Sequence, residues 1–174
     1  MQKPTTNEYN PYFQKYIDLT NEDDFLDQLN ENTAETVQFF SQIPEDKHDY
    51  KYEQDKWTIK QVFLHIIDTE RVFNYRALVA SRGDSETPLH KMDPDKYVAS
   101  VDLSGRTLDS LIWEFTAVRS ATVALFENMT DEQSERIGNN IAFPITPRAL
   151  GYIMIGHILH HIDIMNERYL EDVA

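Results

Sequence analysis

The chain of 174 residues contains no cysteine. Disulfide bonds, thiolate ligands to a metal and a cysteine nucleophile are therefore excluded, and any metal ion must be bound through nitrogen and oxygen atoms. No apolar run is long enough to span a membrane, because the best candidate, residues 150–165, is short and rich in histidine. The polar residues 1–10 lack the apolar core of a secretory signal. We therefore expect a cytoplasmic protein that does not contact membranes.

Basic residues are also scarce. The chain has 16 lysines and arginines against 30 aspartates and glutamates, which gives a formal net charge of −14. This charge repels phosphate backbones, and no cluster of basic residues counters it, so we expect no binding to nucleic acids. A hydrophobic fraction of 41% is ordinary for a globular protein. The length predicts a single domain, residues 1–174, with a sizeable core.

No alternating pattern is long enough to predict a strand, so no significant sheet is expected. Amphipathic helices are predicted instead for residues 20–44, 58–82, 107–129 and 146–169, each opened by a threonine at a capping position. Each helix has one apolar face, and burying the four faces together predicts an all-α, four-helix bundle. Residues 84–106, with a short helical turn near residues 93–97, are long enough to form a crossover connection.

Residues 1–19 do not continue this pattern. They contain Pro4 and Pro11, which interrupt regular structure, and aromatic side chains at Tyr9, Tyr12 and Tyr16. We expect an N-terminal arm that packs across the domain.

Histidines on the predicted helices indicate a metal site. His157 and His161 are one turn apart on the apolar face of the fourth helix, a spacing at which two imidazoles can bind one ion. His65 faces inward from the second helix and is the best third ligand, whereas His48 and His90 fall in connections. The alternative is that these histidines are core residues that bind no metal, because a lone buried histidine is more often a core residue than a ligand.

Other polar residues could support this site. His160 falls at the edge of the apolar face, beside the ligands or at the surface, and Asp68 could orient an imidazole or be a solvated helix residue. The arginines on the helices could bind an anionic substrate, but salt bridges with Asp68, Glu70 or Glu114 are the simpler interpretation. These arginines are Arg71, Arg76, Arg119 and Arg168.

Several short segments resemble the DinB/YfiT-like superfamily. They are residues 56–61 (KWTIKQ), 65–71 (HIIDTER), 75–78 (YRAL), 156–161 (GHILHH) and 167–169 (ERY). The resemblance implies a four-helix bundle with a crossover, often a homodimer, that binds one zinc or nickel ion. It assigns the metal to one histidine on the second helix and two on the fourth, which here are His65, His157 and His161. It also implies a metal-dependent hydrolase or a thiol S-transferase that uses bacillithiol or mycothiol.

Two functions are consistent with this pattern. In the first, three neutral imidazoles leave the ion its full charge, so that it activates water or a low-molecular-weight thiol toward a small-molecule substrate. The alternative is a non-catalytic, stress-associated bundle with a structural metal. A structural site would be closed by a fourth protein ligand, for which His160 and Asp68 are the natural candidates.

Overall fold

The structure is a computed structural model that describes residues 1–89, 91–138 and 143–170. Within these ranges it is helical and contains no strand, only an isolated antiparallel bridge between Gly138 and Ile145. The predicted all-α class is therefore confirmed. His90 and the predicted turn at Asn139 and Asn140 lie outside the described residues. No described helix is long and apolar enough to cross a membrane.

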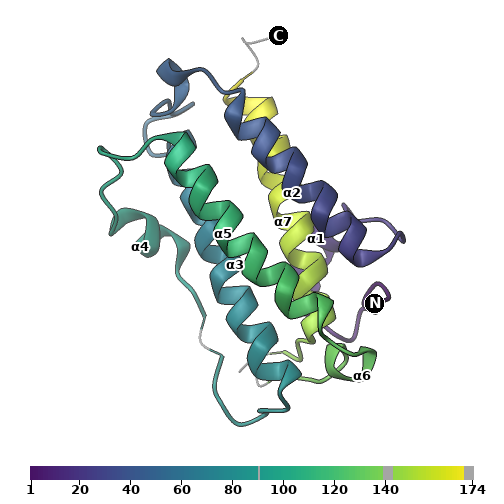
Figure 1. The fold of residues 1–174 in the computed structure, drawn as a ribbon. Helices are drawn as coiled ribbons and strands as arrows, with labels where there is room; N and C mark the ends of the chain where they lie inside the picture. Colours follow the sequence, from purple (N-terminus) through teal and green to yellow (C-terminus); the bar gives the residue numbers. More distant parts are fainter. Residues whose placement is uncertain (90, 139–142, 171–174) are drawn as a thin grey trace.

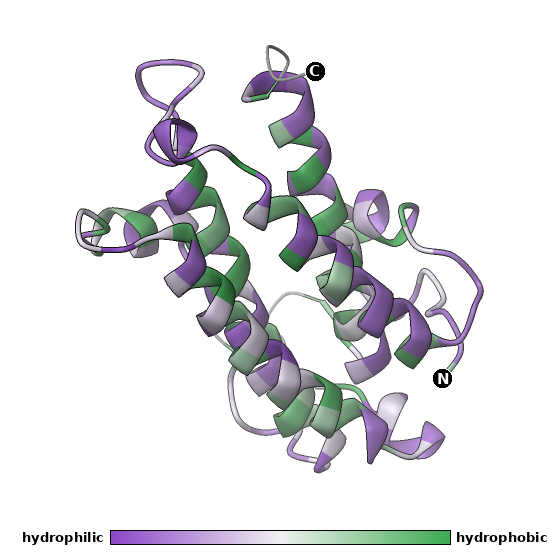
Figure 2. Cartoon of the chain, turned by 45° about the horizontal axis from the view of Figure 1, so that its top comes forward, coloured by the Kyte–Doolittle hydropathy of each residue, from purple (hydrophilic) through white to green (hydrophobic). Residues whose placement is uncertain are grey.

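Four long helices form the bundle (Figure 1). They are α2 (Phe25–Ser41), α3 (Ile59–Ser81), α5 (Leu108–Glu127) and α7 (Pro147–Arg168). The shorter elements are η1 (Pro11–Phe13), α1 (Gln14–Ile17), η2 (Glu45–Lys47), α4 (Pro94–Ala99) and α6 (Asp131–Ser134). Figure 2 shows hydrophobic and hydrophilic residues alternating along the long helices, as expected of amphipathic helices that share one core.

Three of the four predicted threonine caps are present. Thr58 forms a capping box with Gln61, and the side chains of Thr107 and Thr146 accept hydrogen bonds from the first turns of α5 and α7. The prediction that Thr20 opens the first helix is wrong. Its hydroxyl instead donates to the carbonyl oxygen of Ile17, which closes the end of α1, and Asp24 caps α2.

The bundle has a crossover between two parallel neighbours. Lys60, at the start of α3, donates hydrogen bonds to the carbonyl oxygens of Leu103 and Arg106, just before α5, so both helices begin at the same end. The described residues between them, 82–89 and 91–107, which include α4, must therefore return along the length of the bundle, as Figure 1 shows. At the same end, the hydroxyl of Tyr169 donates to the carbonyl oxygen of Trp57, so α7 is antiparallel to α3.

The N-terminal segment packs directly on α7. A Cβ atom added at Gly156 would lie 1.9 Å from the carbonyl oxygen of Tyr16, so only glycine permits this approach of α1. Nearer the chain start, Arg148 and Thr146 donate hydrogen bonds to the carboxylate of Glu8. These contacts fix α1 against α7 one residue before His157.

Candidate metal centre

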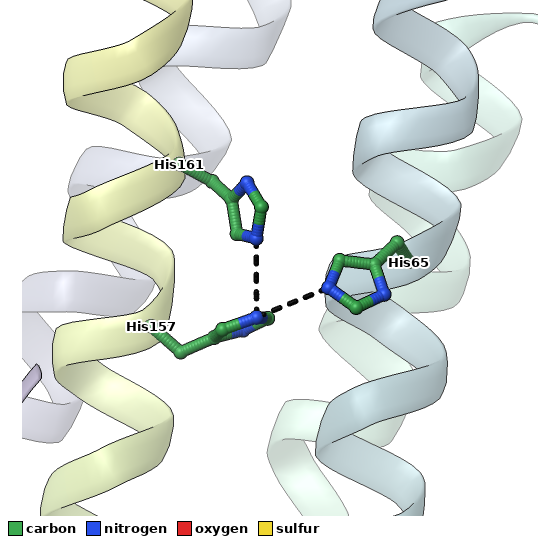
Figure 3. A group of neighbouring side chains, drawn as sticks. All are labelled: His65, His157 and His161. Carbon is green, nitrogen blue, oxygen red and sulfur yellow. Dashed lines mark hydrogen bonds between the residues drawn. The ribbon is translucent and has the colours of Figure 1, made fainter. Parts of the chain in front are cut away.

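Three imidazoles from two antiparallel helices converge on one point. His65 comes from α3, and His157 and His161 come from successive turns of α7. The Nε2 atom of His157 lies 3.1 Å from Nε2 of His65 and 3.1 Å from Nε2 of His161 (Figure 3). The three residues offer ligand atoms that all lie within 4.8 Å of one another.

Hydrogen bonding alone explains this arrangement poorly. A ring nitrogen carries either one proton or one lone pair, so Nε2 of His157 cannot form two good hydrogen bonds in the same plane. A tetrahedral zinc ion bound at 2.0–2.1 Å, by contrast, would hold its nitrogen ligands about 3.3 Å apart. The observed separations of 3.1 Å are close to that value. The donor set therefore fits a divalent ion.

Burial keeps these imidazoles neutral. Desolvation is the largest effect on all three: it lowers the pKa of His65 to about 4, that of His161 to about 3 and that of His157 well below 6.5. Repulsion by the neighbouring histidines and by Lys15 adds to the lowering for His157 and His161. Near pH 7 the rings are unprotonated, so each has a lone pair available for a metal.

Aromatic side chains surround the cluster on two sides. The ring of Trp57 lies 4.9 Å from that of His65, and the ring of Tyr16 lies 5.4 Å from that of His157. His65 and His157 are buried, whereas His161 is partly exposed. The open side of the cluster is therefore the side of His161.

The sequence model of the DinB superfamily matches residues 28–165. The chain belongs to this superfamily. The match confirms the resemblance found in the sequence and includes all three clustered histidines. No curated protein matches the chain.

Three solved structures have a fold similar to that of this chain. YfiT from Bacillus subtilis, described as a probable metal-dependent hydrolase with an unusual four-helix bundle topology, has a TM-score of 0.74 at 20% identity, covering 98% of this chain and 93% of its own. The DinB-like YjoA from the same organism has a TM-score of 0.61 at 19% identity, and the match covers 86% of this chain and 92% of YjoA. A mycothiol-dependent maleylpyruvate isomerase has a TM-score of 0.66 at 12% identity, and the match covers 86% of this chain and 62% of the isomerase. The chain therefore has the four-helix bundle fold of the superfamily.

The two residues predicted to support the ligands differ in their positions. The ring of His160 packs edge-on against Tyr16 and His161, at 5.3 and 5.5 Å, so it lies beside the cluster. Asp68 instead accepts a hydrogen bond from Arg71. The group that faces Nδ1 of His65 is the hydroxyl of Thr69, at 3.4 Å. Neither His160 nor Asp68 joins the cluster, which has no fourth histidine or carboxylate ligand among the described residues.

The remaining candidates lie elsewhere. His48 contacts the carbonyl oxygen of Ile43 in the connection after α2. Salt bridges account for two arginines, because Arg71 pairs with Asp68 and Glu114, and Arg119 pairs with Glu70. The other two lie against aromatic rings, Arg76 over Phe73 and Arg168 over Tyr52.

Sequence reasoning missed Lys15 of α1, a cation whose charge acts on His157 and His161. Its ammonium group lies 4.8 Å from the ring centroids of both Tyr12 and Tyr16. The available signal was indirect: an aromatic arm predicted to pack somewhere, and a glycine immediately before His157. Neither indicates which surface the arm covers.

Proposed function

We propose that the protein is a divalent-metal-dependent enzyme whose ion is bound by His65, His157 and His161. The observation that carries the proposal is the pair of 3.1 Å separations between Nε2 atoms, in a cluster of neutral imidazoles. Nitrogen donors suit zinc and nickel, which are the ions we favour. Membership of the DinB superfamily and the similarity to YfiT, described as a probable metal-dependent hydrolase, support this assignment.

The proposed reaction is hydrolysis or thiol transfer on a small-molecule substrate. A divalent ion bound here would supply a Lewis acid that lowers the pKa of a coordinated water or thiol. Trp57 and Tyr16 restrict water on two sides of the cluster, and the partly exposed side at His161 is left for the substrate. Because the chain has no cysteine, a thiol such as bacillithiol or mycothiol must come from solution.

The second candidate is a non-catalytic bundle that holds a structural metal. Structural zinc sites have four protein ligands, whereas catalytic sites have three and leave a position open. The cluster of three histidines favours the catalytic site over the structural one. A homodimer, which the resemblance to the superfamily implies, and a cytoplasmic location, expected from the sequence, are further parts of this proposal.

Elemental analysis of protein purified without a histidine tag tests the metal assignment. We expect about one equivalent of zinc or nickel in the wild type, and none in His157→Ala with its helical circular dichroism retained. His48→Ala is the matched control, because His48 is not a member of the cluster, and it should keep the ion. Stoichiometric metal in His157→Ala would exclude the assignment. Cobalt substitution, followed by titration with a small thiol, then distinguishes an open site from a closed one.

A further inference from the structure

The second ring nitrogen of His65 faces a threonine hydroxyl. Nε2 of His65 lies 3.1 Å from Nε2 of His157, so the cluster uses only one of the two nitrogens of this ring. Oγ1 of Thr69, one helical turn later on α3, lies 3.4 Å from the other nitrogen, Nδ1. The side chains of His65 and Thr69 are only 8% and 4% exposed, so the contact is shielded from water.

Thr69 differs from the other threonines inside the long helices. Each of their hydroxyls donates to the backbone carbonyl oxygen four residues earlier, a common bond of helical threonines. These residues are Thr33, Thr36, Thr116 and Thr122. Within the described residues, the hydroxyl of Thr69 bonds to no carbonyl oxygen and contacts the imidazole of His65 instead. Its position therefore serves the histidine.

Packing alone leaves the orientation of the His65 ring undecided. A half-turn about the Cβ–Cγ bond exchanges Nε2 with Cε1 and Nδ1 with Cδ2, and the two orientations have nearly the same shape. The ring of Trp57, 4.9 Å from that of His65, therefore contributes little to the choice between them. The hydroxyl of Thr69 does contribute, because after the half-turn it would face a carbon atom and lose its hydrogen-bonding partner. It favours the orientation in which Nε2 points to the cluster.

A hydroxyl suits this ring both with and without an ion. An imidazole that offers the lone pair of Nε2 to a metal carries its proton on Nδ1, which then donates to Oγ1 of Thr69. Without an ion, Nε2 of His65 can carry the proton toward His157, and the hydroxyl then donates to Nδ1. Because the hydroxyl both donates and accepts, the ring need not turn when an ion binds.

We propose that Thr69 is a positioning residue, which fixes the ring of His65 with Nε2 toward the cluster and thereby raises the affinity of the site for its ion. This inference rests on the proposed metal-dependent function. Thr69 is not a ligand, and it acts on the ion only through His65. Residues that orient a metal ligand in this way contribute about 10- to 100-fold to metal affinity.

Zinc affinities of the wild type and of variants test the inference. Thr69→Val keeps the branched side chain without its hydroxyl, and we expect affinity to fall about 10- to 100-fold. Thr69→Ala lacks the hydroxyl as well and should show a similar loss, whereas Thr69→Ser keeps it and should stay close to the wild type. Thr36→Val is the matched control, because Thr36 is buried but bonds to the backbone, and it should leave the affinity unchanged. Competition with a chromogenic chelator gives each constant.

Proton NMR of the zinc-loaded proteins distinguishes positioning from a general loss of structure. The Nδ1 proton of His65 should resonate further upfield in Thr69→Val, which lacks its acceptor, whereas the Nδ1 protons of His157 and His161 should not move. Wild-type affinity in both Thr69→Val and Thr69→Ala, an equal loss in Thr69→Ser, or an unmoved His65 resonance would overturn the inference while leaving the metal site intact. A wild type that binds no zinc would instead overturn the proposed function.

Discussion

The guanidinium group of Arg119 donates two hydrogen bonds to the carboxylate of Glu70, at 2.7 and 2.8 Å, between two parallel helices in the bundle core. Both side chains are at most 2% exposed. Further hydrogen bonds from Thr122 to Glu70, and from Arg119 to Asn32 and Thr33, complete the network. The pair therefore links α2, α3 and α5 about one and a half turns beyond His65 along α3.

Breaking this pair should destabilise the protein strongly. Glu70→Leu leaves the buried guanidinium without its counter-charge, so we expect the free energy of unfolding to fall by about 3–5 kcal/mol. The double variant Glu70→Leu/Arg119→Met removes both charges and should lose less than the single variant. Urea unfolding measures both. As a control, Glu132→Ala breaks the exposed pair with Arg136 and should cost no more than about 1 kcal/mol.

Adjacent histidines on α7 should differ sharply in their effect on metal binding. His161→Ala removes a ligand, and we expect affinity for zinc to fall more than about 100-fold, beyond the effect usual for residues that only support a ligand. His160→Ala removes a ring that packs beside the cluster and should change affinity tenfold or less. Competition with a chromogenic chelator gives both constants. Equal losses in the two variants would contradict the assignment of ligands.

Acid should destabilise the metal-free protein at unusually mild pH. The histidine pKa values are lowered in the folded state, to about 4 for His65 and about 3 for His161, but return to about 6.5 on unfolding. Below pH 6.5 the unfolded chain therefore binds more protons than the folded chain. As the pH is lowered, the free energy of unfolding decreases by up to about 1.4 kcal/mol per pH unit for each histidine. This contribution is fully present above pH 6.5 and is lost progressively down to the folded pKa values.

Unfolding by urea in the presence of EDTA, between pH 7 and 5, measures this dependence. His65→Gln should reduce the slope by about one proton. A slope that is unchanged in this variant would show that other groups cause the acid sensitivity.

Gly156→Ala should detach the N-terminal segment. The new methyl group would overlap the carbonyl oxygen of Tyr16, a backbone atom that cannot move independently of α1. We expect a cost of about 1–3 kcal/mol for the displaced packing, only partly offset by roughly 1 kcal/mol of helix propensity. Faster proteolysis within residues 1–20 would report the detachment. Gly105→Ala is the control, because nothing lies within 4 Å of a Cβ atom at that position.

The helices and the clustered histidines could be predicted because both depend on local spacing. Thr58, Thr107 and Thr146 cap helices through contacts within four residues. His157 and His161 lie on the same face of α7 because residues four apart on a helix always do. Helical spacing does not decide between Asp68 and Thr69, three and four residues after His65, because both fall on its side of α3; in the structure Thr69 faces that ring and Asp68 bonds to Arg71.

Contacts between distant segments could not be predicted in this way. Thr20 has the spacing of a cap, yet its hydroxyl bonds to Ile17, because α1 ends there. The position of Lys15 depends on the docking of α1 on α7 through Tyr16 and Gly156, which are 140 positions apart in the sequence. No local sequence pattern predicts such a contact. The carboxylate partner of Arg119 likewise lies on another helix.

Two of the three clustered histidines lie on α7, the last long helix of the described chain. During synthesis the N-terminal helices emerge first, and His65 is exposed alone until α7 has left the ribosome and docked against α3. Under the proposed metal assignment, a chain whose α7 has not yet docked offers its ion either His65 alone or the pair on α7 alone. The complete three-histidine site therefore forms only when the bundle is assembled.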